Sequence, residues 1–145
     1  MEAKNLCFWD LESAPFRIYG VWKEIGKFRR IPEEVAEKVS KEVYKLHTNT
    51  AGGRVRFVTD SACVAVRIKI ANIRWVGQMS STGGACLDLY AKDDTKENYI
   101  GTFVPPYEVT DGYEGVLQFL DKKERVVTIN FPLFCDGQCL RSSSH

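Results

Sequence analysis

The 145-residue sequence lacks several features that mark large protein classes. No apolar run approaches the 18 or more residues of a membrane-spanning helix, and the first twenty residues hold no apolar stretch of signal-peptide length. We therefore expect no membrane partner, and a chain that is cytoplasmic or has lost a leader, with the first favoured. Lys and Arg number 20 against 19 Asp and Glu, so the sequence also lacks the positive excess of a nucleic-acid binder.

Cysteine and histidine are too few and too scattered for a metal site or a disulfide framework. The cysteines are odd in number, and the pair Cys135 and Cys139 has no second pair to complete a zinc site. We interpret all five as buried or idle thiols: Cys7, Cys63, Cys86, Cys135 and Cys139. The glycine pairs Gly52-Gly53 and Gly83-Gly84 lack the strand, glycine spacing and helix of a dinucleotide site, so we read them as turns. We expect no cofactor and no metal.

What the chain does contain is the composition of one globular domain over residues 1–145. Hydrophobic residues make up 44% and charged residues 27% of it. A chain of this length removes roughly two thirds of its unfolded surface from water on folding. It can therefore build a core without disulfides or metal.

Period-two alternation dominates the chain from residue 53 onward. Residues 54–57 alternate basic with apolar, and residues 63–70 place Val64, Val66, Ile68 and Ile70 on one face. We predict that these two strands form a half-buried hairpin whose loop is residues 59–62. Further strands are predicted at residues 16–19, 43–48, 87–90, 99–103, 116–119 and 126–131.

One helix is expected over residues 32–39, where Pro32 suits a helix start and two glutamates complement the positive end of the helix dipole. Only Val35, Ala36 and Val39 could face a core, so the helix is short. About eight strands and one short helix predict an all-β fold, a jelly-roll-like antiparallel β-sandwich.

Thr59-Asp60-Ser61 invites an enzyme interpretation, because Gly-Asp-Ser carries the nucleophile of the GDSL or SGNH hydrolases. That mechanism needs a general base from an Asp-x-x-His pair, but Tyr44 and Ser142 stand three residues before His47 and His145. We therefore interpret Ser61 as an exposed turn residue, whose replacement by Ala changes stability by less than about half a kcal/mol. Acidic pairs such as Asp93-Asp94 are interpreted as solvated surface.

Four motifs, in this order, resemble the N-terminal domain of SGNH-type esterases, named for its Gly-x-Asp-Leu-Tyr signature. They are residues 28–32, residues 49–61, residues 83–90 and residues 129–133. The resemblance covers residues 8–134, and the signature glycine falls at Cys86. Residues 135–145 diverge from the strand that would lead into an esterase domain, and we leave open an early end of the chain or a tag remnant at residues 142–145.

The resemblance implies a β-sandwich that precedes a catalytic domain and packs against it. Ester hydrolysis, for example of an acetyl group on a sugar, would then belong to a parent protein and not to this chain. We expect a non-catalytic accessory domain that helps to shape the neighbouring active site, with that catalytic domain as its partner. Acetylated carbohydrate is a further candidate partner, and self-association through the exposed face is expected.

Two other classes of function stay open at this point. A free-standing carbohydrate-binding module needs exposed aromatic rings, and a structural or oligomerisation domain needs a large apolar patch. The candidate substrate-binding residues are Trp22, Trp75, Asp88 and Tyr90. Alternation places Asp88 and Tyr90 on the face opposite Leu87 and Leu89, away from the core, where a cross-strand hydrogen bond is the simpler interpretation.

Overall fold

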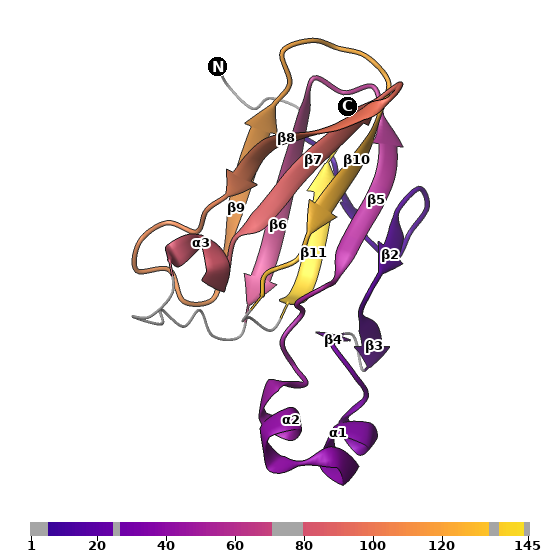
Figure 1. Cartoon of the computed structure of the whole chain (residues 1–145). Helices are drawn as coiled ribbons and strands as arrows, with labels where there is room; N and C mark the ends of the chain where they lie inside the picture. The colour runs from indigo at the N-terminus through magenta and orange to yellow at the C-terminus, as the bar shows by residue number, and fades with distance from the viewer. Residues whose placement is uncertain (1–5, 25–26, 71–79, 134–136, 144–145) are drawn as a thin grey trace.

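Two antiparallel sheets packed face to face form the body of the protein (Figure 1). The computed structural model describes residues 6–24, 27–70, 80–133 and 137–143. The four-stranded sheet has the order β1 (Phe8–Asp10), β11 (Gly137–Ser143), β6 (Cys63–Ile70) and β9 (Gly112–Gln118). The five-stranded sheet has the order β2 (Arg17–Tyr19), β5 (Arg54–Thr59), β10 (Arg125–Asn130), β7 (Leu87–Asp93) and β8 (Lys96–Phe103). The predicted all-β sandwich is confirmed.

The core lies between the two sheets and follows the alternation in the sequence. In β6, Val64, Val66, Ile68 and Ile70 are buried while Arg67 and Lys69 are exposed. The five-stranded sheet contributes alternating apolar residues in the same way: Val55, Phe57, Leu87, Leu89, Val127 and Ile129. β5, β6 and β7 therefore bury one face of the pleat, as period two requires.

The predicted hairpin of residues 54–57 and 63–70 is wrong. β5 pairs with β2 and β10, whereas β6 pairs with β11 and β9 in the other sheet. The connection at residues 59–62 therefore carries the chain from the five-stranded sheet to the four-stranded sheet, and the connection from β9 to β10 crosses in the opposite direction. The alternation of a sequence indicates which face of a strand is apolar, but it does not indicate which other strand pairs with it.

The helical region departs from prediction in two ways. The expected first helix is present as α1 (Glu33–Val39), but Val35 and Val39 are exposed and Ala36 alone of the three is buried. The strand predicted at 43–48 is wrong, because Lys41–Leu46 forms helix α2. The Ser40 hydroxyl accepts a hydrogen bond from the Val43 amide at 3.1 Å, which caps this helix. Such capping outweighs the weak β preference of the segment.

Several elements of the structure were not predicted from the sequence pattern. The two-stranded sheet of β3 (Trp22–Glu24) and β4 (Lys27–Arg29) has strands of three residues, too short to show a period. β11 lies in the segment after Phe134 for which we expected no apolar strand. Helix α3 (Ser81–Gly84) precedes β7. Among the described residues, no helix is long and apolar enough to cross a membrane.

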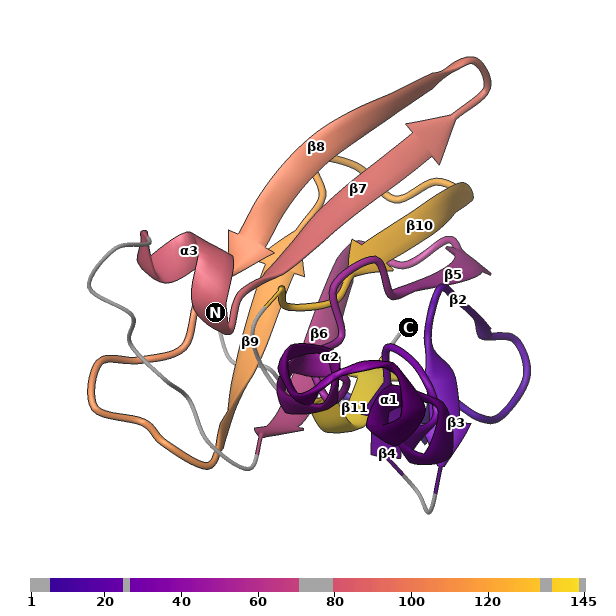
Figure 2. The ribbon, with the colours of Figure 1, turned by 60° about the horizontal axis from the view of Figure 1, so that its bottom comes forward.

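The sandwich has two distinct ends. At the crossover end, defined by residues 59–63 and 119–125, both of the connections described above pass between the sheets. At the motif end, defined by the turn at residues 50–53, by residues 86–88 and by residues 130–133, three of the four sequence motifs meet. The β3–β4 hairpin and helices α1 and α2 lie beyond the motif end (Figures 1 and 2).

Candidate functional site

The turn at the motif end is built around two glycines. The Gly53 amide donates to the Thr50 carbonyl at 2.9 Å, which closes a β-turn, and Gly52 has a φ of +88° that favours glycine. A Cβ on Gly53 would lie 2.5 Å from Cγ1 of Val21. The buried Thr50 hydroxyl donates to the Pro132 carbonyl at 3.0 Å. The turn is therefore tied to the chain segment that follows β10.

Register brings four polar residues into one row across the outer face of the five-stranded sheet. Arg54 is paired with Asn130, Asn130 with Asp88, and Asp88 with Thr102. Facing residues in adjacent strands lie close enough for their side chains to interact. Arg54, Asn130 and Asp88 line a pocket of about 270 Å³, together with Gly52, Gly53, Cys86, Phe131 and Leu133. We call it the motif pocket.

A chain of hydrogen bonds reaches the carboxylate of this pocket. The Thr102 hydroxyl donates to Oδ1 of Asp88 at 2.7 Å, which uses its single proton. Tyr99 must therefore donate to Thr102, whose Oγ1 lies 2.5 Å from the Tyr99 hydroxyl oxygen. The expected cross-strand hydrogen bond of Asp88 is thus present, and it fixes the orientation of the carboxylate.

Two arginines lie on β5, which is separated from the carboxylate on β7 by β10. The guanidinium carbons of Arg54 and Arg56 lie 5.7 and 5.8 Å from the centre of the Tyr19 ring. Nε of Arg56 donates to the Thr128 hydroxyl at 3.2 Å. A planar guanidinium, a carboxamide and a carboxylate side by side offer donors and acceptors to one polar segment.

The remaining motif reaches the same end through an aromatic contact. The rings of Phe28 and Phe131 are buried, and their centres lie 5.6 Å apart. Motifs far apart in the sequence therefore converge on the pocket and on the packing beneath it.

Comparison with known proteins identifies this arrangement. A family model described as GxDLY, the N-terminus of SGNH hydrolase-type esterases, matches residues 6–141. The chain belongs to the GxDLY family. Among curated protein sequences, no relative matches it.

Two solved structures share the GxDLY fold. One is described as a GDSL-like lipase from Bacteroides ovatus ATCC 8483, with a TM-score of 0.84 and 21% identity over 97% of this chain. The other is the salicylyl-acyltransferase SsfX3 from a tetracycline biosynthetic pathway, with a TM-score of 0.65 and 19% identity over 99% of this chain. This chain spans 41% of the length of each of these proteins.

Of the predicted site residues that the structure describes, Asp88 alone lines the motif pocket. Tyr90 lies two residues further along the same face, with the centre of its ring 5.5 Å from that of Tyr99. Trp22 is 53% exposed on β3. Trp75 lies outside the described residues. Sequence reasoning missed Arg54, Asn130 and Thr102, since register alone places them in one row with Asp88.

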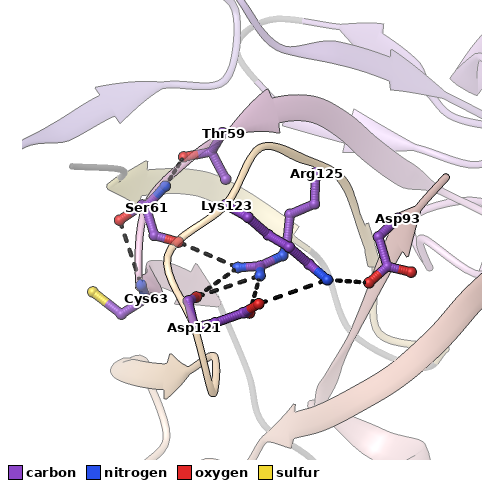
Figure 3. Close-up of polar contacts among 7 residues, drawn as sticks. All are labelled: Thr59, Ser61, Cys63, Asp93, Asp121, Lys123 and Arg125. Carbon is purple, nitrogen blue, oxygen red and sulfur yellow. Dashed lines mark hydrogen bonds and ion pairs between the residues drawn. The ribbon is translucent and has the colours of Figure 1, made fainter.

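Ser61 lies at the crossover end, where it is buried, so the expectation of an exposed turn residue is wrong. Its backbone amide donates to the Thr59 hydroxyl at 3.1 Å, and its own hydroxyl accepts from the Cys63 amide at 3.4 Å (Figure 3). These contacts belong to a hydroxyl-stabilised turn. The Arg125 guanidinium adds a bond of 3.5 Å to the Ser61 carbonyl.

His47 is also buried and has both ring nitrogens engaged. Nη1 of Arg29 lies 2.7 Å from Nε2, and Nδ1 contacts the Tyr44 carbonyl. Because arginine only donates, Nε2 accepts and the proton sits on Nδ1. The neutral tautomer therefore holds the end of α2 against β4 and is not presented to a substrate.

Proposed function

We propose that this chain is the non-catalytic N-terminal accessory domain of an SGNH-type carboxylic-ester hydrolase. In this proposal it packs on a catalytic domain and helps to shape that domain's active site. The observation that supports it most is the convergence of three of the four motifs on one polar pocket at one end of the sandwich, with the fourth motif packed beneath it. The ester, for example an acetyl group on a sugar, is a substrate of the parent protein.

A catalytic role for the chain itself has no support from Ser61 or from His47. Ser61 is fully buried at the crossover end, whereas His47 lies beyond the opposite end and has both nitrogens bonded. An SGNH-type nucleophile must instead reach a carbonyl carbon while a base accepts its proton. We therefore assign the chemistry to another domain.

Exposed apolar side chains around the motif end favour it as the docking face. Leu133 borders the motif pocket and is 46% exposed, and Trp22, Val35, Val39 and Leu46 are exposed on the β3–β4 hairpin and the two helices. Exposed apolar groups near a polar pocket are typical of an interface with a polar rim. The catalytic domain is the partner that this face would cover.

The first test is hydrolysis of p-nitrophenyl acetate by the purified chain. We expect no turnover, and any trace should be equal in wild type and in Ser61→Ala. Turnover that disappears in Ser61→Ala would refute the non-catalytic assignment.

The second test concerns the partner. Continuing the natural reading frame past residue 134 should show a Gly-Asp-Ser segment and an Asp-x-x-His pair. The catalytic domain so encoded is then assayed with and without this chain. The wild-type chain should raise its kcat/KM, and Asp88→Ala should raise it less than Lys69→Ala, a matched variant on the other sheet. An equal rate with and without the chain would contradict the accessory role.

Self-association follows from the same exposed face. Without its partner, the chain should form dimers or larger species at high concentration, measured by light scattering in reductant. A strict monomer at millimolar concentration would argue against an apolar docking face, and would favour a free-standing binding module.

A further inference from the structure

A second and larger pocket, of about 510 Å³, lies at the crossover end. We call it the crossover pocket. Its walls come from the ends of β7 and β9, from β8, and from the connection that leads into β10. This volume lies within the range of pockets that hold small organic ligands, roughly 300 to 1,000 Å³. The motif pocket lies at the opposite end, so the two are separate sites.

The charges that line the crossover pocket cancel. Nζ of Lys123 lies 2.6 Å from Asp93 and 3.6 Å from Asp121, and Nη2 of Arg125 is paired with Asp121 (Figure 3). The hydrogen bond from Lys123 lowers the pKa of the Asp93 carboxyl, and the same bond raises the pKa of Lys123. Two cations therefore face two anions over the neutral pH range. A ligand with a net charge would find no uncompensated partner here.

The polar side chains of the crossover pocket have unused hydrogen-bond donors and unused acceptors. The Lys123 ammonium has three N–H donors for two carboxylate partners, and Asp93 has a second carboxylate oxygen. Within the described part of the chain, the Gln118 side chain has no hydrogen-bond partner, and it supplies one acceptor and two donors. Groups that donate and accept side by side suit hydroxyls, which do both.

Part of the lining is apolar. Leu120 is fully exposed, and Ile100 and Phe119 line the pocket with it, the ring of Phe119 being held under the Arg125 guanidinium at 4.1 Å. Tyr99 also contributes to the lining, but its ring packs against Tyr90 and its hydroxyl bonds to Thr102 on the outer face of the sheet. Exposed aliphatic side chains offer a surface to the C–H groups of a ligand whose edges carry hydroxyls.

We propose that the crossover pocket binds a neutral saccharide unit. Its hydroxyls bond to Asp93, Lys123 and Gln118, and its C–H groups pack on Leu120. The proposal places saccharide recognition away from Trp22, Asp88 and the motif pocket. It concerns the isolated chain, so it stands or falls independently of the accessory role and of any esterase activity.

The test is saturation-transfer NMR on the full 145-residue chain with xylobiose, mannobiose and cellobiose at millimolar concentration. We expect transfer to the ring C–H protons of at least one of these sugars. Loss of a charge-assisted hydrogen bond should weaken binding about tenfold in Asp93→Asn and in Lys123→Ala. Both side chains are about half exposed, so neither variant should unfold the protein.

Matched controls make the assignment specific. Lys92→Ala removes a lysine next to Asp93 that does not line the pocket, and Trp22→Ala removes the earlier aromatic candidate; both should leave transfer unchanged. No transfer to any of the three sugars would overturn the proposal. Transfer that persists in both pocket variants, or that Trp22→Ala abolishes, would also overturn it. Tighter binding of glucuronate or glucosamine would overturn the neutral class of ligand.

Discussion

The motif end and the crossover end are closed by different physical means. At the motif end two backbone segments approach so closely that glycine is required: a Cβ on Gly20 would lie 2.1 Å from the carbonyl oxygen of Gly52. At the crossover end one buried side chain, Arg125, bonds to the carbonyls of Ser61 and Asp121 and packs on Phe119. The first end depends on steric fit and the second on hydrogen bonding. Substitutions at the two ends should therefore lower the free energy of unfolding for different reasons.

The largest effect should come from Gly20→Ala. The new Cβ meets backbone, which cannot rotate away, and Gly20 has a φ of +74°. We expect a loss of more than about 3 kcal/mol in the free energy of unfolding, measured by urea titration. Gly52→Ala is the control, because its φ is +88° but its Cβ would meet nothing within 4 Å. It should cost only about 1–2 kcal/mol of conformational strain. Equal losses would mean that steric fit does not close the motif end.

Arg125→Ala should have the next largest effect. The arginine is 5% exposed, and its loss leaves the Ser61 carbonyl without this donor inside the protein. We expect a loss of about 2–3 kcal/mol in the free energy of unfolding. Lys92→Ala, an exposed lysine on the neighbouring strand β7, should change it by less than about 0.5 kcal/mol. Equal stability of the two variants would show that the hydrogen bonds of Arg125 do not stabilise the contact between the β5–β6 and β9–β10 connections.

Ser61→Ala should have a smaller effect at the same end. The structure buries the hydroxyl that accepts the Cys63 amide, so its removal costs about 1 kcal/mol in place of the near-zero change expected of an exposed turn. Thermal unfolding of this variant beside Arg125→Ala ranks the two contacts. A stability equal to wild type would restore the interpretation from sequence.

The smallest effect concerns the ionisation of Tyr44 in helix α2, beyond the motif end. Its hydroxyl donates to Glu33 at 3.0 Å, and this hydrogen bond to the carboxylate raises the pKa of Tyr44 above its usual 10.0. A raised pKa in the folded state means that the stabilisation is complete below about pH 10 and is lost as the pH rises through the folded value. NMR of ring-labelled tyrosine should show Tyr44 ionising at a higher pH than in Glu33→Gln. Identical curves would show that the bond is absent in solution.

The buried faces of β6 and β7 could be predicted from the alternation in the sequence. Which strands pair with each other in a sheet could not. Residues 63–70 bury the side that alternation predicts, because a pleated strand points successive side chains to opposite faces. That the strand after Thr59 enters a different sheet has no local signal, since both pairings bury the same apolar face. The predicted hairpin failed for this reason, and so did the exposed position of Ser61.

The candidate sites divide along the same line. Asp88 could be named from the signature motif, and its outward orientation from alternation. Arg54 and Asn130 join it only through the register of β5, β10 and β7. From the sequence we interpreted Asp93 as solvated surface, because its partner Lys123 lies far along the chain, on the connection between β9 and β10.

By itself the sequence determined the all-β class, the buried faces of β6 and β7, the start of α1 and the family resemblance, since these depend on local periodicity, on the residues at the helix start and on motif order. Tertiary structure alone decided which strands are neighbours, and with that the row of residues at the motif pocket, the balanced charges of the crossover pocket and the burial of Ser61 and Arg125. The reason is physical: period and capping act within a few residues. Strand pairing is a choice among backbone hydrogen bonds between distant segments, and it is settled only when both sheets close on a common core.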